Sequence, residues 1–508
     1  MKKIIDVSLK CRNVHADKCK TDLLCVALFS KAKTLEKTCE RLDKKLGGAI
    51  AKLIKLGDFK GSEGEIAVLY GNNKISAKRV MLVGLGEKKK VTLDTLRSAA
   101  SKAASKAVAL KAATLSLALH SAVGDKFDNE ALAQAIAEGV CIGGYRYDEY
   151  ITESENGRLG SLKVELIDSN LAKLEKLSKG IKNGSVVGKA QSYARTIANR
   201  PGNVITPASL AAEARKLASR TKGLSCSVFD KKKLTAKGMG GILAVGSGSK
   251  NEPRLIVLKY SPNGAAKGPV VGLVGKAVTF DSGGISIKPS ANMDQMKFDK
   301  SGGIAVLGAM KAIAELGLKV RVYGIIPAAE NMPSGTSYRP GDIVTTYSGK
   351  TVEIQNTDAE GRMILCDALH YAVKQKCDMI IDIATLTGSC VVALGKYSAG
   401  VMGNNDGLIS KIEQAAKDSG EKVWHLPSGG DYLEEMKSKI ADLKNIGSRW
   451  GGACTAASFL GEFVGKTKWA HIDMAGVEMF VESKQGGVGS SGYGVRLLTS
   501  LVQNIKKK

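Results

Sequence analysis

The 508-residue sequence lacks the cysteine and histidine patterns of structural zinc sites and redox motifs. Its ten cysteines are scattered without a single C-x-x-C pair, which excludes a zinc knuckle and a thioredoxin-type motif. Its five histidines are isolated from one another along the chain. Any metal site in this protein must therefore rely on oxygen ligands.

Long apolar runs are also missing. The longest, such as "KAATLSLALH" at residues 111–120, fall well short of the ~20 residues that a membrane span needs. Asp6 interrupts the amino-terminal segment before any apolar stretch is long enough for a signal peptide. We therefore expect a cytoplasmic protein without a membrane partner, whose cysteines are reduced thiols.

Positive charge is what the sequence has in excess. Its formal net charge is +26, and residues 1–120 hold 25 basic residues but only 11 acidic ones. This surplus has two interpretations, a solvated surface or a binding site for nucleic acid or another polyanion. The lysines are spread through the segment and form no tail, which favours the solvated surface. Nucleic acid is thus an alternative partner that the charge pattern does not favour.

A chain of this length is long for one hydrophobic core, so we expect two domains. In residues 1–180, β-branched runs such as "LLCVALFS" and "RVMLVGLG" alternate with helical stretches rich in alanine and lysine. This alternation indicates a smaller α/β domain. Residues 181–207 are the expected connector: the pattern predicts a loop just after position 180, then a helix, and then the Pro/Gly/Asn break "NRPGNVITP".

Residues 208–508 continue the alternation with more strongly apolar strands. "RLIVLKY", "GPVVGLVGKAVTF" and "CDMIIDIATL" are separated by helical runs such as "EGRMILCDALHYAVKQ". Apolar strands between helices predict a larger α/β domain with a central sheet flanked by helices. In such sheets, ligands collect at the carboxyl ends of the strands. We therefore look for candidate functional residues in the loops that follow them.

One group of candidates lies in "NTDAEGR", residues 356–362. Asp358, Glu360 and Arg362 occupy alternate positions, so an extended backbone would project all three to the same side. Two carboxylates that close repel each other unless a cation lies between them. The alternative is a solvated turn in which Arg362 pairs with its neighbours. Further carboxylates placed to join the group would favour a metal site.

Such carboxylates follow the strand predicted at residues 268–280. Lys276 lies just inside this strand, Asp281 at its end, Lys288 in a glycine-rich loop and Asp299 ahead of a helix. Together with the pair in "NTDAEGR", the sequence offers four carboxylates at strand ends or in loops. They balance the charge of two divalent ions, provided that Lys276 coordinates as a neutral amine.

A centre with two ions ~3.5–4 Å apart needs a bridging carboxylate and room for a water whose pKa the metals lower towards neutrality. Oxygen-rich ligands without histidine suit Mg²⁺, Mn²⁺ or Zn²⁺. Each residue alone also has a structural interpretation. Asp281 can accept hydrogen bonds from glycine amides, Asp299 can cap the following helix, and Lys276 can extend to solvent from a strand end.

The segments "VGKAVTFDSGGISIKPSANMDQMKFDKSGG" and "NTDAEGR" resemble the two signatures of the leucyl aminopeptidases, the cytosol aminopeptidase family of dizinc exopeptidases. "ARTIANRPGNVITP" and "WAHIDMAG" are similar to further segments of that family's catalytic domain. The likeness is strong over residues 190–490 and only architectural before them. It implies a metal-dependent aminopeptidase that releases leucine and other mostly apolar residues from peptides through a two-metal-activated water.

Carried over position by position, the resemblance assigns five metal ligands: Lys276, Asp281, Asp299, Asp358 and Glu360. Asp281 and Glu360 would bridge the two ions. The cofactors implied are two Mn²⁺ or Zn²⁺ ions per subunit, with Mg²⁺ as an alternative in one site.

Two basic residues receive catalytic roles by the same resemblance. Lys288 would help polarise the scissile carbonyl and stabilise the gem-diolate, and Arg362 would hold a bicarbonate ion that serves as general base. The family's pocket for the first substrate side chain is matched by Met296, Thr385, Gly388 and Ala475.

The sequence departs from the family's pattern at two places. Lys300 and Ser301 replace a more usual apolar or small pair next to Asp299, and Glu478 lies near the expected wall of the side-chain pocket. The resemblance further implies a macrodomain-like N-terminal domain and a homohexamer whose active sites face an internal cavity.

Two alternatives to the simple peptidase stay open. The first is the same enzyme with an additional DNA-binding regulatory role through its basic N-terminal domain. The second is a different two-metal hydrolase, such as a phosphoesterase. The lack of histidines near the expected ligands disfavours the second.

Overall fold

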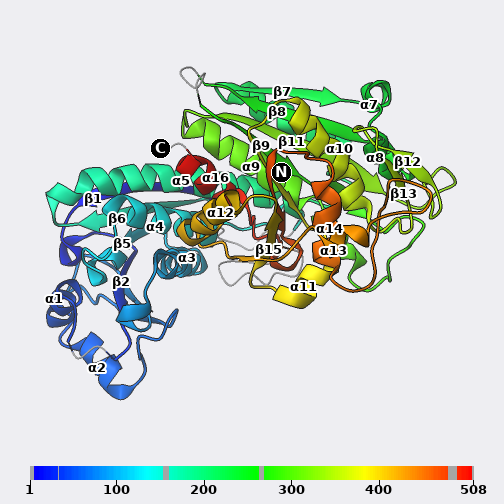
Figure 1. Cartoon of the computed structure of the whole chain (residues 1–508). Coiled ribbons are helices and arrows are strands. Elements are labelled where there is room, and N and C mark those ends of the chain that lie inside the picture. Colours follow the sequence, from blue (N-terminus) through cyan, green and yellow to red (C-terminus); the bar gives the residue numbers. More distant parts are fainter. Residues whose placement is uncertain (1–4, 32–33, 153–158, 263–267, 479–488, 506–508) are drawn as a thin grey trace. The chain divides into compact units, whose positions relative to one another are not determined.

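The computed structural model describes residues 5–31, 34–152, 159–262, 268–478 and 489–505. The described chain forms two compact units, which meet in sequence between Ser192 and Tyr193. Each unit is built of strands and helices (Figure 1). The predicted combination of a smaller and a larger α/β domain is therefore confirmed.

The N-terminal unit is built on a six-stranded sheet with the order β1-β6-β5-β2-β4-β3. Neighbouring strands are parallel except for β3, which runs antiparallel to β4 at the edge. The carboxyl ends of β1, β6, β5 and β2 therefore lie at one edge of the sheet. The strands are β1 (Asp6–Asn13), β2 (Leu23–Leu28), β3 (Ile66–Tyr70), β4 (Arg79–Gly84), β5 (Thr114–Leu117) and β6 (Ser161–Asp168).

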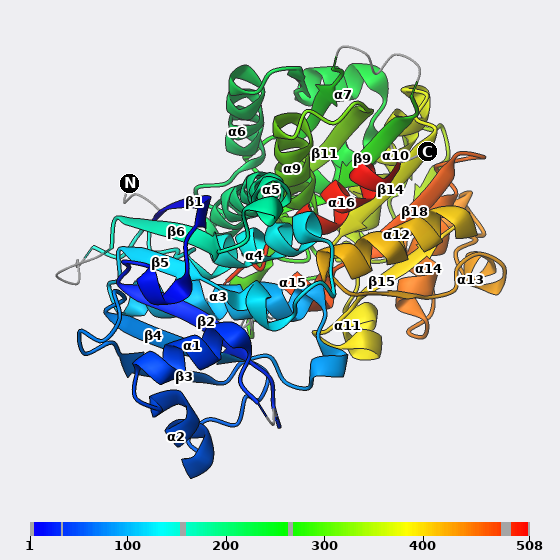
Figure 2. The same ribbon diagram turned by 90° about the vertical axis from the view of Figure 1, so that its left-hand side faces the viewer.

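Helices cover this sheet unequally. Val7 of β1 and Leu162 of β6 belong to a core formed with α3 and α4. Leu24 and Val26 of β2 belong to a second core formed with α1 and α2 (Figure 2). On that second face, β1 exposes polar side chains, because alternate residues of a strand point to opposite faces. The helices are α1 (Lys37–Lys45), α2 (Ala49–Leu56), α3 (Leu93–Ala109) and α4 (Asn129–Gly143).

In the described part of the second unit, nine strands form a mixed sheet with the order β16-β15-β18-β14-β9-β11-β8-β7, and β10 pairs with β11. Its centre, from β18 through β14 and β9 to β11, is parallel. These strands are β7 (Leu224–Phe229), β8 (Arg254–Tyr260), β9 (Val270–Gly275), β10 (Ala277–Asp281), β11 (Arg321–Asn331), β14 (Met379–Ala384), β15 (Ala399–Gly403), β16 (Val423–His425) and β18 (Lys468–Asp473). A small separate sheet joins β12 (Ile343–Thr345), β13 (Thr351–Glu353) and β17 (Leu443–Lys444).

Helices cover both faces of the larger sheet. Gly324 of β11 approaches Met310 of α9, whereas the next residue, Ile325, belongs to a core shared with α10. Successive strand residues point to opposite faces, so α9 and α10 lie on opposite sides. The helices are α6 (Pro207–Arg220), α7 (Lys231–Lys237), α8 (Gly240–Val245), α9 (Ser301–Glu315), α10 (Glu360–Lys374), α11 (Gly388–Leu394), α12 (Asp406–Ser419), α13 (Asp431–Glu434), α14 (Gly452–Gly461), α15 (Ala475–Glu478) and α16 (Val495–Ile505).

The expected connector, residues 181–207, includes much of a long helix. Helix α5 (Leu174–Asn199) is continuous across the boundary between the units, so the residues just after position 180 are helical where a loop was predicted. The Pro/Gly/Asn break then follows the helix, and Pro207 is the first residue of α6. Thr206 caps α6 by accepting from the backbone N–H of Ser209.

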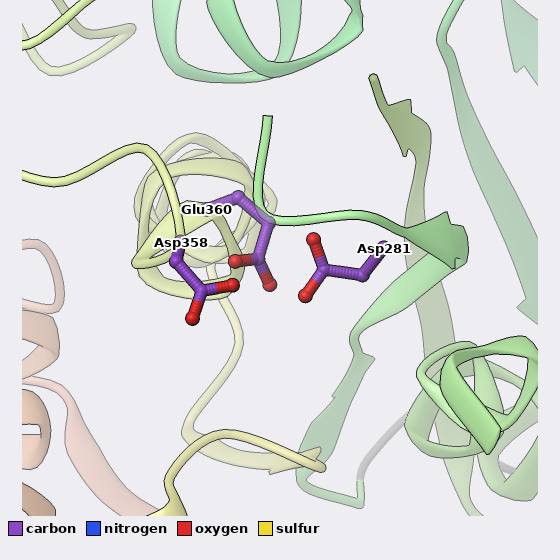
Figure 3. A group of neighbouring side chains, drawn as sticks. All are labelled: Asp281, Asp358 and Glu360. Atoms are coloured by element: carbon purple, nitrogen blue, oxygen red, sulfur yellow. The ribbon is translucent and has the colours of Figure 1, made fainter. Parts of the chain in front are cut away.

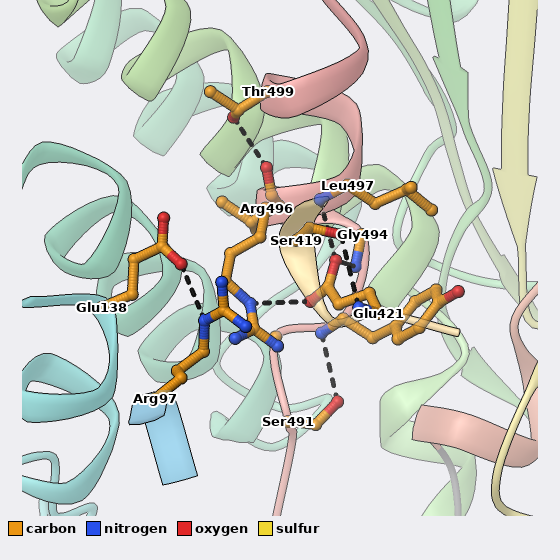
Figure 4. A network of polar contacts seen from close by, with 12 residues as sticks. Arg97, Glu138, Ser419, Glu421, Ser491, Gly494, Arg496, Leu497 and Thr499 are labelled. Carbon is orange, nitrogen blue, oxygen red and sulfur yellow. Dashed lines mark hydrogen bonds and ion pairs between the residues drawn. The ribbon is translucent and has the colours of Figure 1, made fainter. Parts of the chain in front are cut away.

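Each unit also contains a buried ion pair (Figure 4). In the N-terminal unit, Arg97 Nε of α3 lies 2.9 Å from Glu138 Oε2 of α4. In the second unit, Glu421 accepts from Arg496 Nε and from the backbone N–H groups of Gly494 and Leu497. Both oxygens of Glu421 are thereby engaged, and the pair ties the start of α16 to the segment after α12.

All ten cysteines are free thiols. Within the described ranges, the structure contains no helix with the length and apolar character that crossing a membrane requires.

Candidate metal centre

The first group of candidate residues lies where the central strands end. Lys276 is the single residue between β9 and β10, and Asp281 is the last residue of β10. Asp281 is in parallel register with Asn331, the last residue of β11. Asp299 follows a 3₁₀ helix, and only the N-cap residue Lys300 separates it from the start of α9. Side chains that are far apart in sequence thus meet at one edge of the sheet, at the carboxyl ends of its strands, where ligands bind in such sheets.

The "NTDAEGR" segment is not extended. Asp358 lies in a turn, and α10 begins at Glu360, so Arg362 belongs to the first turn of that helix. Successive side chains of an α-helix are rotated by about 100°, which directs Glu360 and Arg362 to different sides. The prediction that all three side chains project to the same side is therefore wrong, because a helix starts inside the motif.

Three carboxylates nevertheless converge. Asp281, Asp358 and Glu360 each offer an oxygen atom, and these atoms all lie within 4.8 Å of one another. Figure 3 shows the three side chains pointing toward a common space from the end of β10, the turn before α10 and the first residue of α10. Asp281 and Glu360 are buried, whereas about a third of the Asp358 side chain is exposed (33%). The cluster therefore opens on the side of Asp358.

Lys276 connects Asp299 to this cluster. Its Nζ lies 2.8 Å from Asp299 Oδ1 and 2.7 Å from Glu360 Oε1, and it donates to the Thr385 carbonyl oxygen at 3.0 Å. Thr385 Oγ1 donates to Asp299 Oδ1 at 2.7 Å. All four side chains are buried. The fourth carboxylate and the lysine of the sequence prediction thus lie in one contact network with the other three.

Lys288 approaches the cluster from its exposed side. Its Nζ lies 2.9 Å from Asp281 Oδ2 and also contacts Asp358 Oδ1. The side chain is 22% exposed, in contrast to the fully enclosed Lys276. Of the two lysines, Lys288 is therefore the one placed to meet a molecule that arrives from solvent.

Crowding of carboxylates in a buried site shows in their pKa values. Burial, reinforced by the charge of Asp281, raises the pKa of Glu360 to about 8 and raises that of Asp358. Burial also raises the pKa of Asp299 to about 6. For Lys276 and Lys288, burial opposes the charge, but the surrounding carboxylates hold the pKa of both above the ordinary value. The anions here are destabilised, and cations relieve them.

Three oxygens of the cluster lack a hydrogen-bond partner among the described residues: Asp299 Oδ2, Glu360 Oε2 and Asp358 Oδ1, of which the last contacts the charged Lys288. Buried polar atoms in native proteins are nearly always partnered, so such atoms point to a bound species. Carboxylate oxygens without histidine are donors that suit Mg²⁺, Mn²⁺ or Zn²⁺. The residues present therefore fit a divalent-metal centre.

Arg362 is a further buried group whose polar atoms lack hydrogen-bond partners. Its side chain is only 7% exposed, and its Nε and Nη1 have no partner among the described residues. Burial lowers its pKa to about 10, against the opposing charges of Glu360 and Asp473. A buried guanidinium with two free donors suits an anion with several acceptor oxygens, such as a carboxylate or carbonate.

The four residues matched to the side-chain pocket lie on elements next to the cluster. Met296 packs on Phe298 and Ala475 in a small apolar cluster. Gly388 is the first residue of α11, and nothing lies within 4 Å of the position that a Cβ atom would take there. Thr385 is engaged with Asp299. Apolar contacts and open space near the carboxylates suit an uncharged side chain.

Sequence reasoning missed the residues that hold Asp281 in place. Asn331 Nδ2 donates to Asp281 Oδ1 at 2.8 Å and to the Thr357 carbonyl oxygen at 3.0 Å. The Tyr338 hydroxyl donates to the same carbonyl oxygen at 2.8 Å. Asn331 therefore links the end of β10 to the turn that carries Asp358. Its position at the end of the strand neighbouring β10 was the available signal, since a polar residue there falls at the same sheet edge.

The two departures from the family's pattern lie close to each other. Lys300 is fully buried, and its Nζ donates to the carbonyl oxygens of Arg200, at 3.0 Å, and Lys297. Glu478 is 1% exposed, and its charge acts on Lys300. Ser301 lies beside the Glu478 carboxylate. The lysine and the serine that replace the more usual apolar or small residues thus both lie within reach of the Glu478 carboxylate.

Glu478 is also occupied by its own partners. Its carboxylate accepts from the hydroxyls of Ser490 and Ser491 and from the Ser491 backbone N–H, at 3.2 Å for the last. The carboxylate is therefore a buried, hydrogen-bonded anion and does not present a free charge to a substrate.

Comparison with known proteins gives a consistent result along the chain. Residues 192–499 match the catalytic domain of the cytosol aminopeptidase family, and residues 25–154 match that family's N-terminal domain. A protein of Alkaliphilus oremlandii named "Probable cytosol aminopeptidase" is 42% identical over 489 residues, which is 96% of this chain and 97% of the relative. A protein of the same name from Chlorobaculum tepidum is 45% identical over 461 residues, 88% of this chain and 90% of the relative.

Two solved structures are similar over nearly the whole chain. A variant of tomato leucine aminopeptidase has a TM-score of 0.89 and 34% identity, covering 99% of this chain and 98% of its own. The bottromycin maturation enzyme BotP in complex with Mn has a TM-score of 0.84 and 32% identity, covering 95% and 99%.

Proposed function

Because the chain belongs to the cytosol aminopeptidase family and is a metal-dependent exopeptidase, we propose that its buried carboxylate cluster holds two divalent metal ions that serve peptide hydrolysis. The observation that carries this proposal is the convergence of three carboxylates within 4.8 Å, with a fourth joined to them through Lys276. The family assignment removes the alternative of an unrelated two-metal hydrolase.

The proposed ligands are Lys276, Asp281, Asp299, Asp358 and Glu360. The free oxygens of Asp299 and Glu360 support this set, and the central position of Glu360, near both Lys276 and Asp281, supports a bridging role for it. Asp281 is the proposed second bridge. When bound, the ions would lower the pKa of a water and act as Lewis acids on the peptide carbonyl. Mn²⁺ is one candidate because a similar structure is a complex with Mn, and Zn²⁺ and Mg²⁺ are the others.

The two basic residues have separate proposed tasks. Lys288 is a partly exposed cation at the mouth of the cluster, so it can stabilise negative charge that develops on the substrate's carbonyl oxygen. Arg362 is a buried cation with two free donors, which supports the proposal that it holds a bicarbonate ion close to the reacting water. An anion held there can accept a proton as general base.

For the substrate, we propose peptides whose first side chain is leucine or another mostly apolar residue. The Met296 and Ala475 contacts and the open space at Gly388 support an apolar pocket. Thr385 would line the pocket through its methyl group, since its hydroxyl bonds to Asp299. Glu478, near the expected pocket wall, is buried and hydrogen-bonded to serine hydroxyls, so it does not present a free charge to the first side chain.

The setting of the enzyme follows the same family. A cytoplasmic location is proposed because the relatives are named as cytosol aminopeptidases. A homohexamer is proposed as well, and large exposed apolar side chains such as Trp424 and Trp450 in the second unit support contacts between subunits.

A DNA-binding role is not favoured. Two of the cations on the exposed strand face of the N-terminal unit, Lys10 and Arg12, lie 3.1 and 3.2 Å from the two oxygens of Glu165. Their charge is thus partly compensated within the protein. A gel shift that persists at moderate salt would reverse this judgement, because phosphate contacts weaken steeply with salt.

The proposal is tested by chelation followed by metal restoration. Hydrolysis of leucyl, methionyl and acidic aminoacyl amides should vanish after chelation and return with Mn²⁺ or Zn²⁺, highest for the apolar substrates. An N-acetylated leucyl amide is the matched control and should not be cleaved. Full turnover in a sample shown to be metal-free by elemental analysis would overturn the mechanism.

A further inference from the structure

The N-terminal unit contains a cavity of about 200 Å³ that the peptidase activity does not use. Residues that follow β1 and β5, residues at the end of β6, and helix α1, which follows β2, surround it. Figure 2 shows these four strands side by side in one sheet. The cavity therefore lies at the carboxyl ends of parallel strands, where α/β sheets bind their ligands.

Cationic side chains dominate one side of this cavity. Arg41 and Lys37 project from α1, and Arg41 Nη1 lies 2.7 Å from His15 Nδ1. That contact orients the guanidinium, since the ring nitrogen accepts from it. The carboxylate of Asp17 is 3.8 Å from Arg41 and pairs more closely with Lys45, at 3.0 Å. Arg41 therefore keeps donors for another anion.

The same side holds the beginning of α1, a helix of nine residues. Lys37 and Thr38, its first two residues, line the cavity. The first backbone N–H groups of a helix have no acceptor within the helix, and the N-cap residue Glu36 makes no side-chain capping bond. Free N–H groups together with the helix dipole favour an anion at this point.

The opposite side is polar and less charged. His120 is 5% exposed, its Nε2 lies 2.8 Å from Asp168 Oδ2, and its Nδ1 has no partner among the described residues. A buried ring nitrogen without a partner is uncommon unless a ligand or water completes it. Asp168 and Ser121 also line the cavity; the Asp168 oxygens each have one partner, His120 Nε2 and the Asn170 backbone N–H, and the Ser121 hydroxyl donates to the Ala118 carbonyl oxygen. These groups suit the hydroxyls of a ligand, since a carboxylate at such a position accepts hydrogen bonds from a sugar.

We propose that this cavity binds a sugar phosphate. The phosphate group lies against the start of α1, between Lys37 and Arg41, and the sugar hydroxyls face Asp168 and His120. Two cations and a helix N-terminus match a dianionic phosphate better than a singly charged carboxylate. A volume of about 200 Å³ is below that of pockets for drug-sized ligands, which restricts the ligand to a small molecule such as a pentose phosphate.

Isothermal titration of ribose 5-phosphate into the metal-loaded full chain tests this proposal. Arg41→Gln should weaken binding about tenfold or more, because a charge-assisted hydrogen bond is lost. Lys44→Gln is the matched control: it removes the same charge from the same helix, but Lys44 pairs with Glu40 and does not line the cavity. The control should bind as the unaltered chain does. Lys37→Gln, at an exposed position, is a second variant that avoids any loss of folding.

The affinities of three ligands, compared with one another, test which chemical groups the cavity recognises. Inorganic phosphate should bind more weakly than ribose 5-phosphate, and ribose alone should not bind. All variants keep the same carboxylate cluster. Any phosphate that binds to metal ions there therefore adds the same signal for every variant and does not affect the comparison between them. Equal affinity in Arg41→Gln, Lys37→Gln and Lys44→Gln would overturn the proposed site. Equal affinity for inorganic phosphate and ribose 5-phosphate would overturn the sugar contacts.

Discussion

Two fully buried glutamates of the second unit differ in how their charge is met. Glu421 has both oxygens engaged by Arg496 and by two backbone N–H groups. Glu360 has one oxygen on Lys276, and its other oxygen is free of partners in the described structure. Burial raises the pKa of both, to about 8 for Glu360. Burial and a shifted pKa therefore do not by themselves separate a structural carboxylate from a functional one.

The two glutamates differ in whether both carboxylate oxygens have partners and in which charged groups lie beside them. Glu421 has an arginine beside it, whereas Glu360 lies within a cluster of further carboxylates. A lone buried anion with a full set of donors is a structural element. Several anions that share too few donors need cations from outside the chain. The same criterion singles out Arg362, a buried cation with two free donors.

Exchange of each glutamate for glutamine should produce the largest and clearest contrast. Glu360→Gln should lower turnover of a leucyl amide by about 10³-fold or more, because a metal ligand is worth several kcal/mol in the transition state. Measured on metal-free protein, its resistance to urea should stay unchanged or rise, since one of the repelling carboxylates is gone. Glu421→Gln should do the opposite and lose roughly 3 kcal/mol of unfolding free energy with turnover kept.

Steady-state rates and urea unfolding curves on the two variants check this contrast. A folded Glu421→Gln variant that has lost turnover would remove the distinction between the two glutamates. Equal loss of stability in both variants would do the same.

Arg362→Ala should have the next largest effect. Removal of the group that positions the proposed base should cost ~10²–10⁴-fold in turnover, while the metal content stays unchanged. Arg362→Lys keeps the charge but loses the two-pronged donor set, so it should recover only part of the rate. Rates measured beside metal content test this, and the role fails if Arg362→Ala is active but metal-depleted.

The network behind Asp299 should give a smaller effect. Lys300 follows Asp299 in the chain and donates to the carbonyl oxygens of Arg200 and Lys297. Lys300→Met removes these bonds and should therefore loosen the backbone beside Asp299, the proposed metal ligand. Supporting contacts behind metal ligands typically contribute 10–100-fold to metal affinity, and about tenfold weaker binding is expected here. Lys311→Met is the control, because Lys311 lies on the same helix and pairs with Glu315.

Competition of each variant with a chelator measures this affinity. A double variant tests the coupling between Glu478 and Lys300, because the charge of Glu478 acts on that lysine. Glu478→Gln should weaken metal binding less in the Lys300→Met background than in the unaltered chain. Equal metal affinity in Lys300→Met and Lys311→Met would show that the pair has no part in holding Asp299.

Much of the fold was predictable because strand and helix patterns are local. "RLIVLKY" forms β8 and "EGRMILCDALHYAVKQ" forms α10, each close to the predicted bounds. β1 and β5 were not predicted, since β1 carries polar residues at alternate positions and β5 is only four residues long. The continuous α5 was missed for a different reason. The glycines after position 180 indicated a loop, but Gly180 and Gly184 pack tightly against α4, where no larger side chain fits.

The candidate site was predictable in composition but not in geometry. The four carboxylates and two lysines were read from the chain because they follow strands or precede helices. The direction in which the Arg362 side chain points could not be predicted, because it depends on where α10 begins. Asn331 and the pair of Lys300 with Glu478 were also out of reach, since their contacts join residues separated by tens to hundreds of positions along the chain.

The most direct test of the account is the metal content of three proteins: the unaltered chain, Glu360→Gln and Glu421→Gln. Each is loaded with Mn²⁺ or Zn²⁺, dialysed against metal-free buffer and examined by elemental analysis. The unaltered chain and Glu421→Gln should retain two ions per chain, and Glu360→Gln should retain fewer. Two tightly held ions in Glu360→Gln would contradict the claim that the unmet carboxylates of this cluster hold the metals.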